Sequence, residues 1–86
     1  MTKLDILYFA WVREAIGKDG ELIEHPGSEV TISELILSLA ECGGGYAQAF
    51  AKSDRVRAAL DQNFVPLDAK LGDAQELALF PPVTGG

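Results

Sequence analysis

The C-terminal stretch of the chain begins as a β-strand and ends as a segment that cannot pair in a sheet. From Glu76 to Phe80, the side chains alternate as they do in a strand with one buried face. Pro81 and Pro82 follow, and neither can donate a backbone hydrogen bond to a neighbouring strand. A Pro-Pro pair also favours extended polyproline geometry. The pattern therefore predicts a strand that ends at residue 80 and an extended, flexible tail over residues 81–86, which can reach about 20 Å at roughly 3.3 Å per residue.

The tail ends in Val83, Thr84, Gly85 and Gly86. Two terminal residues without Cβ atoms can enter a channel that is too narrow for side chains, and glycine adopts backbone angles that are closed to other residues. This composition favours the Gly86 carboxylate as the reacting group, once it has been activated. A frayed terminus is the simpler interpretation, since chain ends are often poorly ordered. Fraying, however, requires neither a stiff Pro-Pro pair nor a terminal Gly-Gly.

The balance of charge argues against several classes of function. Thirteen acidic and seven basic residues give a net charge of −6, which does not suit nucleic acid, because phosphate binding needs clustered Lys and Arg. An acidic domain can dock on a basic protein surface, although acidity often serves only solubility. No apolar run reaches the length of a membrane span, so we expect neither a membrane segment nor a signal peptide. With Cys42 as the one cysteine, we expect no disulfide framework and a cytoplasmic location.

The rest of the chain alternates between strand and helix patterns. The main helix is expected over residues 32–42, where Thr31 and Glu34 form a capping-box pattern and apolar residues recur at helical spacing. Gly43-Gly44-Gly45 is expected to end it. Short helices are expected over residues 11–16, closed by Gly17, and over residues 46–52. Strands are expected over residues 3–10, 21–25, 56–62, 64–67 and 76–80, with turns at 19–20 and 62–63.

This order of elements predicts an α+β domain over residues 1–80. A strand pair, one crossing helix and further strands give a mixed sheet of four to five strands with the main helix packed on one face. The first and last strands are expected to pair in parallel at the centre, which places the tail at one end of the sheet. This is the β-grasp arrangement.

Strand parity indicates which side chains lie on the face of the sheet away from the helix. The apolar residues at positions 4, 6 and 8 and at positions 77 and 79 are assigned to the core. Leu7, Phe9 and Phe80 then lie on the opposite, open face, where Phe9 and Phe80 are expected to form an apolar patch at the base of the tail. Scattered apolar groups on a surface are the ordinary alternative. Because aromatic side chains often anchor interfaces, we expect Phe80, Phe9 and Leu7 to contact a partner protein.

The body of the domain shows no second motif that suggests chemistry. Cys42 lies near the end of a helix without a CxxC partner, so we expect it to be a small apolar packing residue. His25 is expected at the surface beside Pro26. Gly43-Gly44-Gly45 lacks the spacing of a phosphate loop and follows a helix instead of preceding one. The acidic residues are scattered without metal-ligand spacing, so we expect no metal, no tightly bound cofactor and no active site in the body.

Motifs at both ends of the chain resemble one family. Phe9-Ala10, Arg13-Glu14 and Gly17 are similar to an opening motif, and Leu79 to Gly86 is similar to a C-terminal signature, of the small subunit of molybdopterin synthase (MoaD type). That family belongs to the ubiquitin-like proteins. The segment 58–62 lies where the family commonly has Val-Asn-Gln, with Asp61 in place of Asn. The resemblance covers residues 4–17 and 56–86, whereas the middle matches only in length and helical character.

The resemblance implies a sulfur carrier. In this family an adenylating enzyme related to ubiquitin E1 (MoeB-like) uses ATP to adenylate the terminal glycine, here Gly86, which is then converted to a thiocarboxylate. The tail inserts into a large subunit (MoaE-like), in a heterotetramer, and donates sulfur to cyclic pyranopterin monophosphate. Two sulfurs make the dithiolene of molybdopterin.

Three other functions stay open at this point. A sulfur carrier for thiazole synthesis shares the fold and the Gly-Gly, although such chains are usually shorter and lack the Phe-Pro-Pro-Val-Thr run. A ubiquitin-like modifier would be joined to lysines through Gly86. A plain interaction domain would carry the Gly-Gly incidentally.

Overall fold

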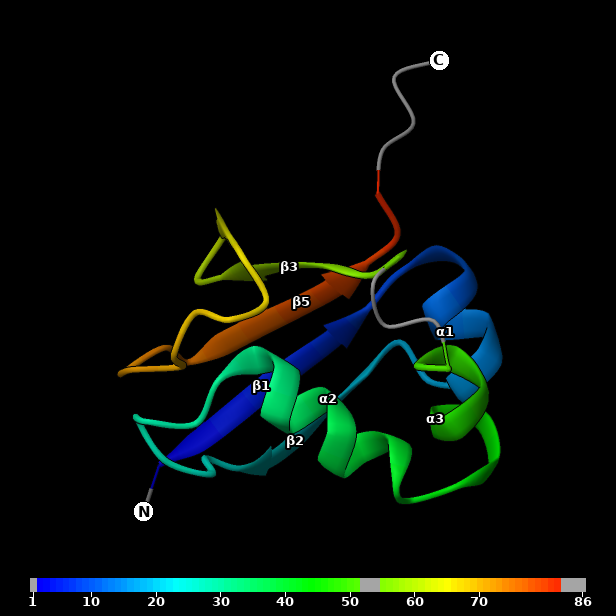
Figure 1. The fold of residues 1–86 in the computed structure, drawn as a ribbon, viewed down its shortest axis with the longest axis horizontal. Coiled ribbons are helices and arrows are strands. Elements are labelled where there is room, and N and C mark those ends of the chain that lie inside the picture. The colour runs from blue at the N-terminus through cyan, green and yellow to red at the C-terminus, as the bar shows by residue number, and fades with distance from the viewer. Residues whose placement is uncertain (1, 52–54, 83–86) are drawn as a thin grey trace.

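The computed structural model describes residues 2–51 and 55–82. Within these residues it contains five strands and three helices (Figure 1). In chain order they are β1 (Lys3–Tyr8), α1 (Ala10–Ile16), β2 (Gly20–Glu24), α2 (Ile32–Ala40), α3 (Gly44–Ala49), β3 (Arg57–Leu60), β4 (Asn63–Val65) and β5 (Glu76–Phe80). The predicted α+β class and the predicted bounds of the last strand are confirmed.

The five strands form one mixed sheet in the order β2-β1-β5-β3-β4. β1 and β5 pair in parallel at its centre, with Tyr8 opposite Leu79, as the sequence predicts. The other neighbouring strands are antiparallel. Figure 1 shows β1 and β5 side by side and pointing toward the end of the sheet where α1 begins. A chain that leaves β5 therefore leaves from the middle of the sheet and not from an edge.

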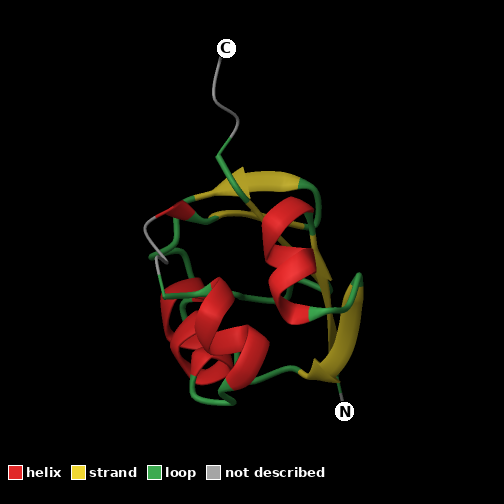
Figure 2. Ribbon diagram, turned by 90° about the vertical axis from the view of Figure 1, so that its right-hand side faces the viewer, coloured by secondary structure: helices red, strands yellow, loops and turns green. Residues whose placement is uncertain are grey.

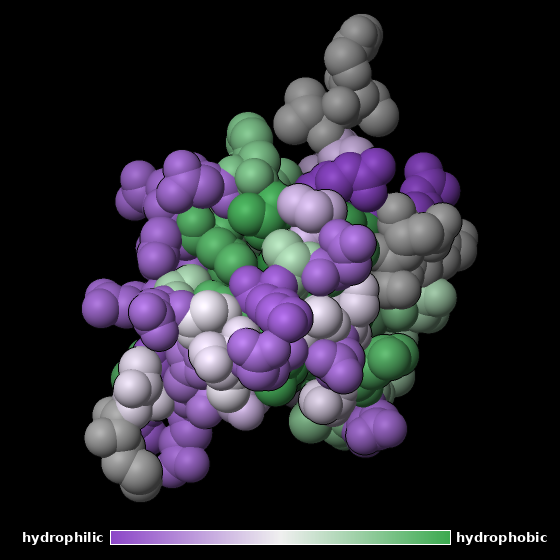
Figure 3. Space-filling view, turned by 60° about the vertical axis from the view of Figure 1, so that its left-hand side comes forward, coloured by the Kyte–Doolittle hydropathy of each residue, from purple (hydrophilic) through white to green (hydrophobic). Residues whose placement is uncertain are grey.

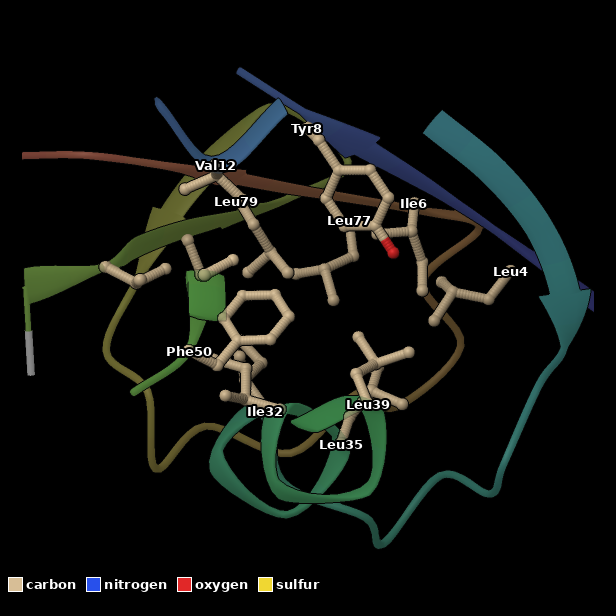
Figure 4. Close-up of a cluster of buried hydrophobic side chains, with 14 of the residues drawn as sticks. Leu4, Ile6, Tyr8, Val12, Ile32, Leu35, Leu39, Phe50, Leu77 and Leu79 are labelled. Carbon is tan, nitrogen blue, oxygen red and sulfur yellow. The ribbon is translucent and has the colours of Figure 1, made fainter. Parts of the chain in front are cut away.

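The core lies between the sheet and α2. Leu4, Ile6 and Tyr8 of β1 and Leu77 and Leu79 of β5 are all buried, and Figure 4 shows them pointing toward the helix. From the helix side they meet apolar residues that include Ile32, Leu35 and Leu39. Figure 2 shows α2 against the inner side of the sheet, with the other two helices gathered next to each other. Burial of each large aliphatic side chain stabilises the fold by about 1.5–3 kcal/mol, so strand parity is strongly fixed.

The start of α2 agrees with the predicted capping box. The Thr31 hydroxyl accepts a hydrogen bond from the Glu34 backbone N–H at 3.1 Å, and the Glu34 carboxylate accepts one from the Thr31 N–H at 2.9 Å. The helix ends at Ala40, two residues before the predicted end, because the chain tightens there and Gly43 turns left-handed with φ of +78°. Cys42 consequently lies outside the helix and is exposed, so its assignment as an apolar packing residue was wrong.

Gly43-Gly44-Gly45 separates two helices and also begins the second one. Gly44 and Gly45 are the first residues of α3, where a loop was expected. A Cβ atom on Gly45 would collide with the carbonyl oxygen of Ala15 in α1. The absence of a side chain at this position therefore lets α3 cross α1 at close range.

Most other boundaries differ from the sequence prediction by one to three residues, and the differences at β1, at the β3–β4 turn and at β4 have local reasons. β1 ends at Tyr8 and not at residue 10, because Ala10 has a left-handed φ of +54° that begins α1. The β3–β4 turn lies at Asp61 and Gln62, one residue earlier than expected, and both residues have positive φ. β4 therefore begins at Asn63 and is only three residues long.

Glu21 ties the β1–β2 hairpin to α3. Its carboxylate accepts hydrogen bonds from the hydroxyl of Tyr8 at 2.7 Å and from the hydroxyl of Tyr46 at 2.6 Å. The Nζ atom of Lys18 lies 3.2 Å from one of the carboxylate oxygens. Burial, followed by the hydrogen bond to Glu21, raises the pKa of Tyr8. The network holds α3 beside the sheet.

Candidate functional site

The root of the predicted tail lies at the end of β5. Leu77 and Leu79 are completely buried, and the Leu79 carbonyl accepts a hydrogen bond from the backbone N–H of Phe9 at 3.1 Å. Pro81 and Pro82, which follow directly, are half-buried. The strand is thus held by both neighbours up to Phe80, and the two prolines continue from a rigid support.

The predicted reacting group is the carboxylate of Gly86. Gly86, together with Val83, Thr84 and Gly85, lies outside the described residues. What the structure establishes is the base from which these residues continue.

The open face of the sheet carries the side chains that parity assigns to it. Leu7 of β1 lies opposite Ala78 of β5 on this face, and Leu7 and Phe80 are both half-buried. Phe9, in the extended conformation just before α1, is 45% exposed. Together with Ala59 of β3, which is opposite Ala78, Leu7 and Phe80 give the open face an apolar centre, whereas the contact expected between Phe9 and Phe80 stays a prediction.

The aromatic neighbour of Phe80 is Phe64, which the sequence analysis did not assign to this face. The two ring centroids are 5.7 Å apart in a tilted arrangement. Phe64 lies on β4, opposite Ala59, and is 83% exposed. Extending the parity argument through the β3–β4 hairpin would have placed Phe64 beside Phe80. Parity finds it with either turn, because the predicted turn at residues 62–63 pairs Phe64 with residue 61, which shares a strand face with Ala59.

A hollow of about 230 Å³ lies against this aromatic pair, next to the end of β5. It is lined by Arg57, Ala58, Phe64, Val65 and Phe80. Arg57 is opposite Phe80 in the sheet, so it brings a positive charge to the rim of an otherwise mostly apolar depression. Figure 3 shows apolar residues reaching the surface among hydrophilic ones on the side of the molecule that carries β3 and β4. A hollow of this kind suits an apolar side chain from another protein.

Asp61 fixes the other end of β5. One of its carboxylate oxygens accepts hydrogen bonds from the backbone N–H groups of Gln75 and Glu76, both at 3.0 Å, and the Asp61 N–H donates to the Glu76 carbonyl at 3.0 Å. Only acceptor atoms are used on the side chain, and Asn offers the same acceptor. The departure from the Asn of the similar family therefore preserves these hydrogen bonds.

The remaining candidates show no catalytic arrangement among the described residues. His25 is half-buried, and its Nδ1 accepts a hydrogen bond from the Gly27 N–H at 3.1 Å. Over residues 2–51 and 55–82 no three His, Cys, Asp or Glu side chains gather in a way that would hold a metal ion. No helix in the same part of the chain is long and apolar enough to cross a membrane.

Comparisons with known proteins agree on one family. The profile of the ThiS family matches residues 6–86. A "Molybdopterin synthase sulfur carrier subunit" from Haemophilus influenzae is 36% identical over 84 residues, which is 96% of this chain and 99% of that protein. A protein of the same name from Mycobacterium tuberculosis is 31% identical over the whole length of both chains.

Solved structures confirm the fold. The small archaeal modifier protein SAMP1 from Haloferax volcanii superposes with a TM-score of 0.68 at 22% identity, covering 98% of this chain and 99% of that one. At this identity the likeness concerns the fold alone. The neighbours are ubiquitin-like β-grasp proteins, which confirms the β-grasp prediction.

Proposed function

The chain belongs to the ThiS family, and we propose that it is the sulfur carrier subunit of a molybdopterin synthase. Relatives with that name match it over nearly its whole length. The structural observation that supports the proposal most directly is the end of β5. The central strand is anchored on both sides and passes directly into Pro81 and Pro82, so the residues that follow can be presented to a partner.

The proposed chemistry takes place at the terminal carbonyl carbon of Gly86. An E1-like adenylating enzyme binds ATP, and the carboxylate attacks the α-phosphorus, which releases pyrophosphate and leaves an acyl-adenylate. The persulfide of a donor protein then attacks the acyl carbon and displaces AMP, which forms an acyl disulfide. A thiol reductant attacks the donor-side sulfur, so that the S–S bond breaks and leaves the thiocarboxylate on Gly86 and a disulfide on the donor. Activation by ATP is necessary because a carboxylate is unreactive toward nucleophiles. We place these steps in the cytoplasm.

In the second half of the proposed cycle the tail enters the large subunit, in a heterotetramer. The thiocarboxylate sulfur passes to cyclic pyranopterin monophosphate, and hydrolysis of the acyl group returns the carboxylate. Two such cycles supply the two sulfurs of the dithiolene. The small subunit provides the sulfur and its delivery, and the pterin pocket and acid-base groups belong to the large subunit.

We infer that the large subunit docks on the open face at the root of the tail. The candidates are the residues predicted from the sequence, Leu7, Phe9 and Phe80, joined now by Phe64. The exposed Phe64 ring and the adjoining hollow are supporting observations. Arg57 at the rim is suited to a carboxylate of the partner.

Mass spectrometry of the intact chain tests the proposed function. After incubation with the adenylating enzyme, ATP and a sulfur donor, the mass should rise by one exchange of oxygen for sulfur. A chain that lacks Gly86 is the matched control and should stay unchanged. Formation of larger, lysine-linked species would instead identify a protein modifier. Sulfur loading without sulfur transfer to the pterin precursor in the presence of the large subunit would favour the thiazole pathway.

A further inference from the structure

A second surface lies beside the root of the tail, on the helix side of the sheet. Trp11 is in the first turn of α1, which follows β1 directly at the end of the sheet where β5 also ends. Arg55 precedes β3 by two residues, and Arg57, the first residue of β3, is opposite Phe80. The antiparallel course of β3 therefore places Arg55 on the side toward which the chain leaves β5.

Trp11 stands between two hollows. The first, of about 370 Å³, is lined by Trp11, Gln48, Ala49, Ala51 and Arg55. The second, of about 410 Å³, is lined by Trp11, Glu14, Ala15 and Gln48. The indole is 39% exposed, so it forms a ridge with a depression on each side. We refer to Trp11, Glu14, Gln48 and Arg55 as the Trp11 ridge.

The ridge carries one charge of each sign. Glu14 and Arg55 are exposed, and neither forms an ion pair with another described residue. Opposite charges on the two sides of an indole suit a protein partner, because a protein surface supplies both signs of charge, whereas a nucleic acid or an anionic membrane would be repelled by Glu14. Trp is also among the residues that most often dominate binding energy at protein interfaces.

We propose that the Trp11 ridge is a second contact surface for the large subunit, which grips the root of the tail from the helix side. This inference rests on the proposed function. A partner that encloses the tail in a channel must surround its root, and the root is flanked by the open face on one side and by the ridge on the other. The occupant is the rim of that channel, with apolar side chains against the indole and a carboxylate facing Arg55.

The single tryptophan of the chain makes the proposal directly testable. This chain is labelled with 5-fluorotryptophan and titrated with the unlabelled large subunit, and the ¹⁹F resonance of Trp11 is followed. Formation of the complex is monitored separately by sedimentation. We expect the resonance to shift as the complex forms. An unchanged resonance in a fully formed complex overturns the proposal, and so does a shift that only the adenylating enzyme produces.

Affinity measurements give the second test. Trp11→Ala should weaken binding of the large subunit about tenfold, which corresponds to about 1.4 kcal/mol, and Trp11→Phe should restore most of the loss. Leu37→Ala is the matched control, since Leu37 is also an exposed apolar residue but lies on α2. Urea unfolding confirms that each variant is folded. If Trp11→Ala binds as tightly as the wild type, the ridge is not a contact surface.

The two proposals fail in different ways. If the wild-type chain forms no thiocarboxylate and no complex with the large subunit, the proposed function fails. If the wild type does both while the Trp11 resonance and the Trp11→Ala affinity stay unchanged, only the inference about the ridge fails.

Discussion

Replacement of Asp61 tests how β5 is held at the end opposite the tail. The carboxylate accepts two backbone N–H groups at 3.0 Å each, and each such hydrogen bond contributes about 0.5–1.5 kcal/mol. Asp61 also has a left-handed φ of +48°, which costs Ala about 1 kcal/mol more than it costs Asp, Asn or Gly. Because the site is exposed, we take the two hydrogen bonds together as about 1–2 kcal/mol.

Three substitutions separate these contributions. Asp61→Asn keeps both the acceptor and the tolerance of left-handed φ, so the free energy of unfolding should change by less than about 0.5 kcal/mol. Asp61→Gly loses the acceptor without strain and should cost about 1–2 kcal/mol. Asp61→Ala loses the acceptor and adds strain, and should cost about 2–3 kcal/mol.

Urea unfolding of the three variants measures these differences, and hydrogen exchange at the Gln75 and Glu76 amides reports the two bonds directly. Asp68→Ala is the control, because Asp68 is an exposed acidic residue in the neighbouring loop. The reasoning is refuted if Asp61→Asn costs as much as Asp61→Ala, or if Asp61→Ala behaves like Asp68→Ala.

Three further predictions concern the Glu21 network, the crossing of α1 and α3, and the Pro-Pro pair. Burial alone would raise the pKa of Glu21, but hydrogen bonds from Tyr46, Tyr8 and Lys18 outweigh it and lower the pKa below the ordinary value of 4.5. The ionised Glu21 carboxylate therefore stabilises the fold above pH 4.5, and this stabilisation is lost as the pH falls through the lowered pKa. In a plot of the urea midpoint against pH, Glu21→Gln should make the fall at acid pH less steep. The control Glu24→Gln should leave that fall as steep as in the wild type. Gly45→Ala should destabilise the fold by about 2–3 kcal/mol because the new Cβ meets the Ala15 carbonyl. Gly44→Ala should cost about 1 kcal/mol, because its Cβ has open space but its φ is +53°. Equal costs of the two variants in thermal unfolding would contradict this. Replacing both residues of the Pro81-Pro82 pair by Gly should weaken binding to the large subunit more than it lowers thermal stability, because the freed tail loses more entropy on binding, and a calorimetric titration with equal losses would count against it.

The core was predictable because the spacing of apolar residues along the strands and the helix allows only one set of side chains to be buried together. Only one parity of the first and last strands buries Ile6 and Leu77 together, and a helix with Thr31 as its cap has only one apolar face to set against them. Both expectations agree with the structure. The short elements were less predictable because single backbone angles decide them. The positive φ of Ala10 and of Asp61 moved a strand end and a turn, and no hydrophobic period reports such an angle.

The site was predictable in part for the same reason. Parity assigned Leu7 and Phe80 to the open face, and it assigns Phe64 there as well once the β3–β4 hairpin is included, because Phe64 is opposite Ala59. The Trp11 ridge was not recognised, because its residues come from α1, from α3 and from Arg55, two residues before β3. α1 and α3 approach each other closely at Gly45, which the sequence shows as part of an unexplained run of glycines.

The aromatic pair on the open face gives a prediction that separates folding from binding. Phe64 is 83% exposed on the three-residue edge strand β4, so it contributes little to the core, and an exposed aromatic side chain at a sheet edge favours unwanted association. Phe64→Ser should therefore change the free energy of unfolding by less than about 0.5 kcal/mol, as surface substitutions usually do. Phe80→Ala should lower the affinity for the large subunit by about 2 kcal/mol, as interface anchors do, with only a small loss of stability. Urea unfolding and calorimetric titration of both variants measure the two quantities, with Leu37→Ala as the control. If either variant unfolds as a core deletion does, or if Phe80→Ala binds like the wild type, then the open face is not the docking surface that the proposed function requires.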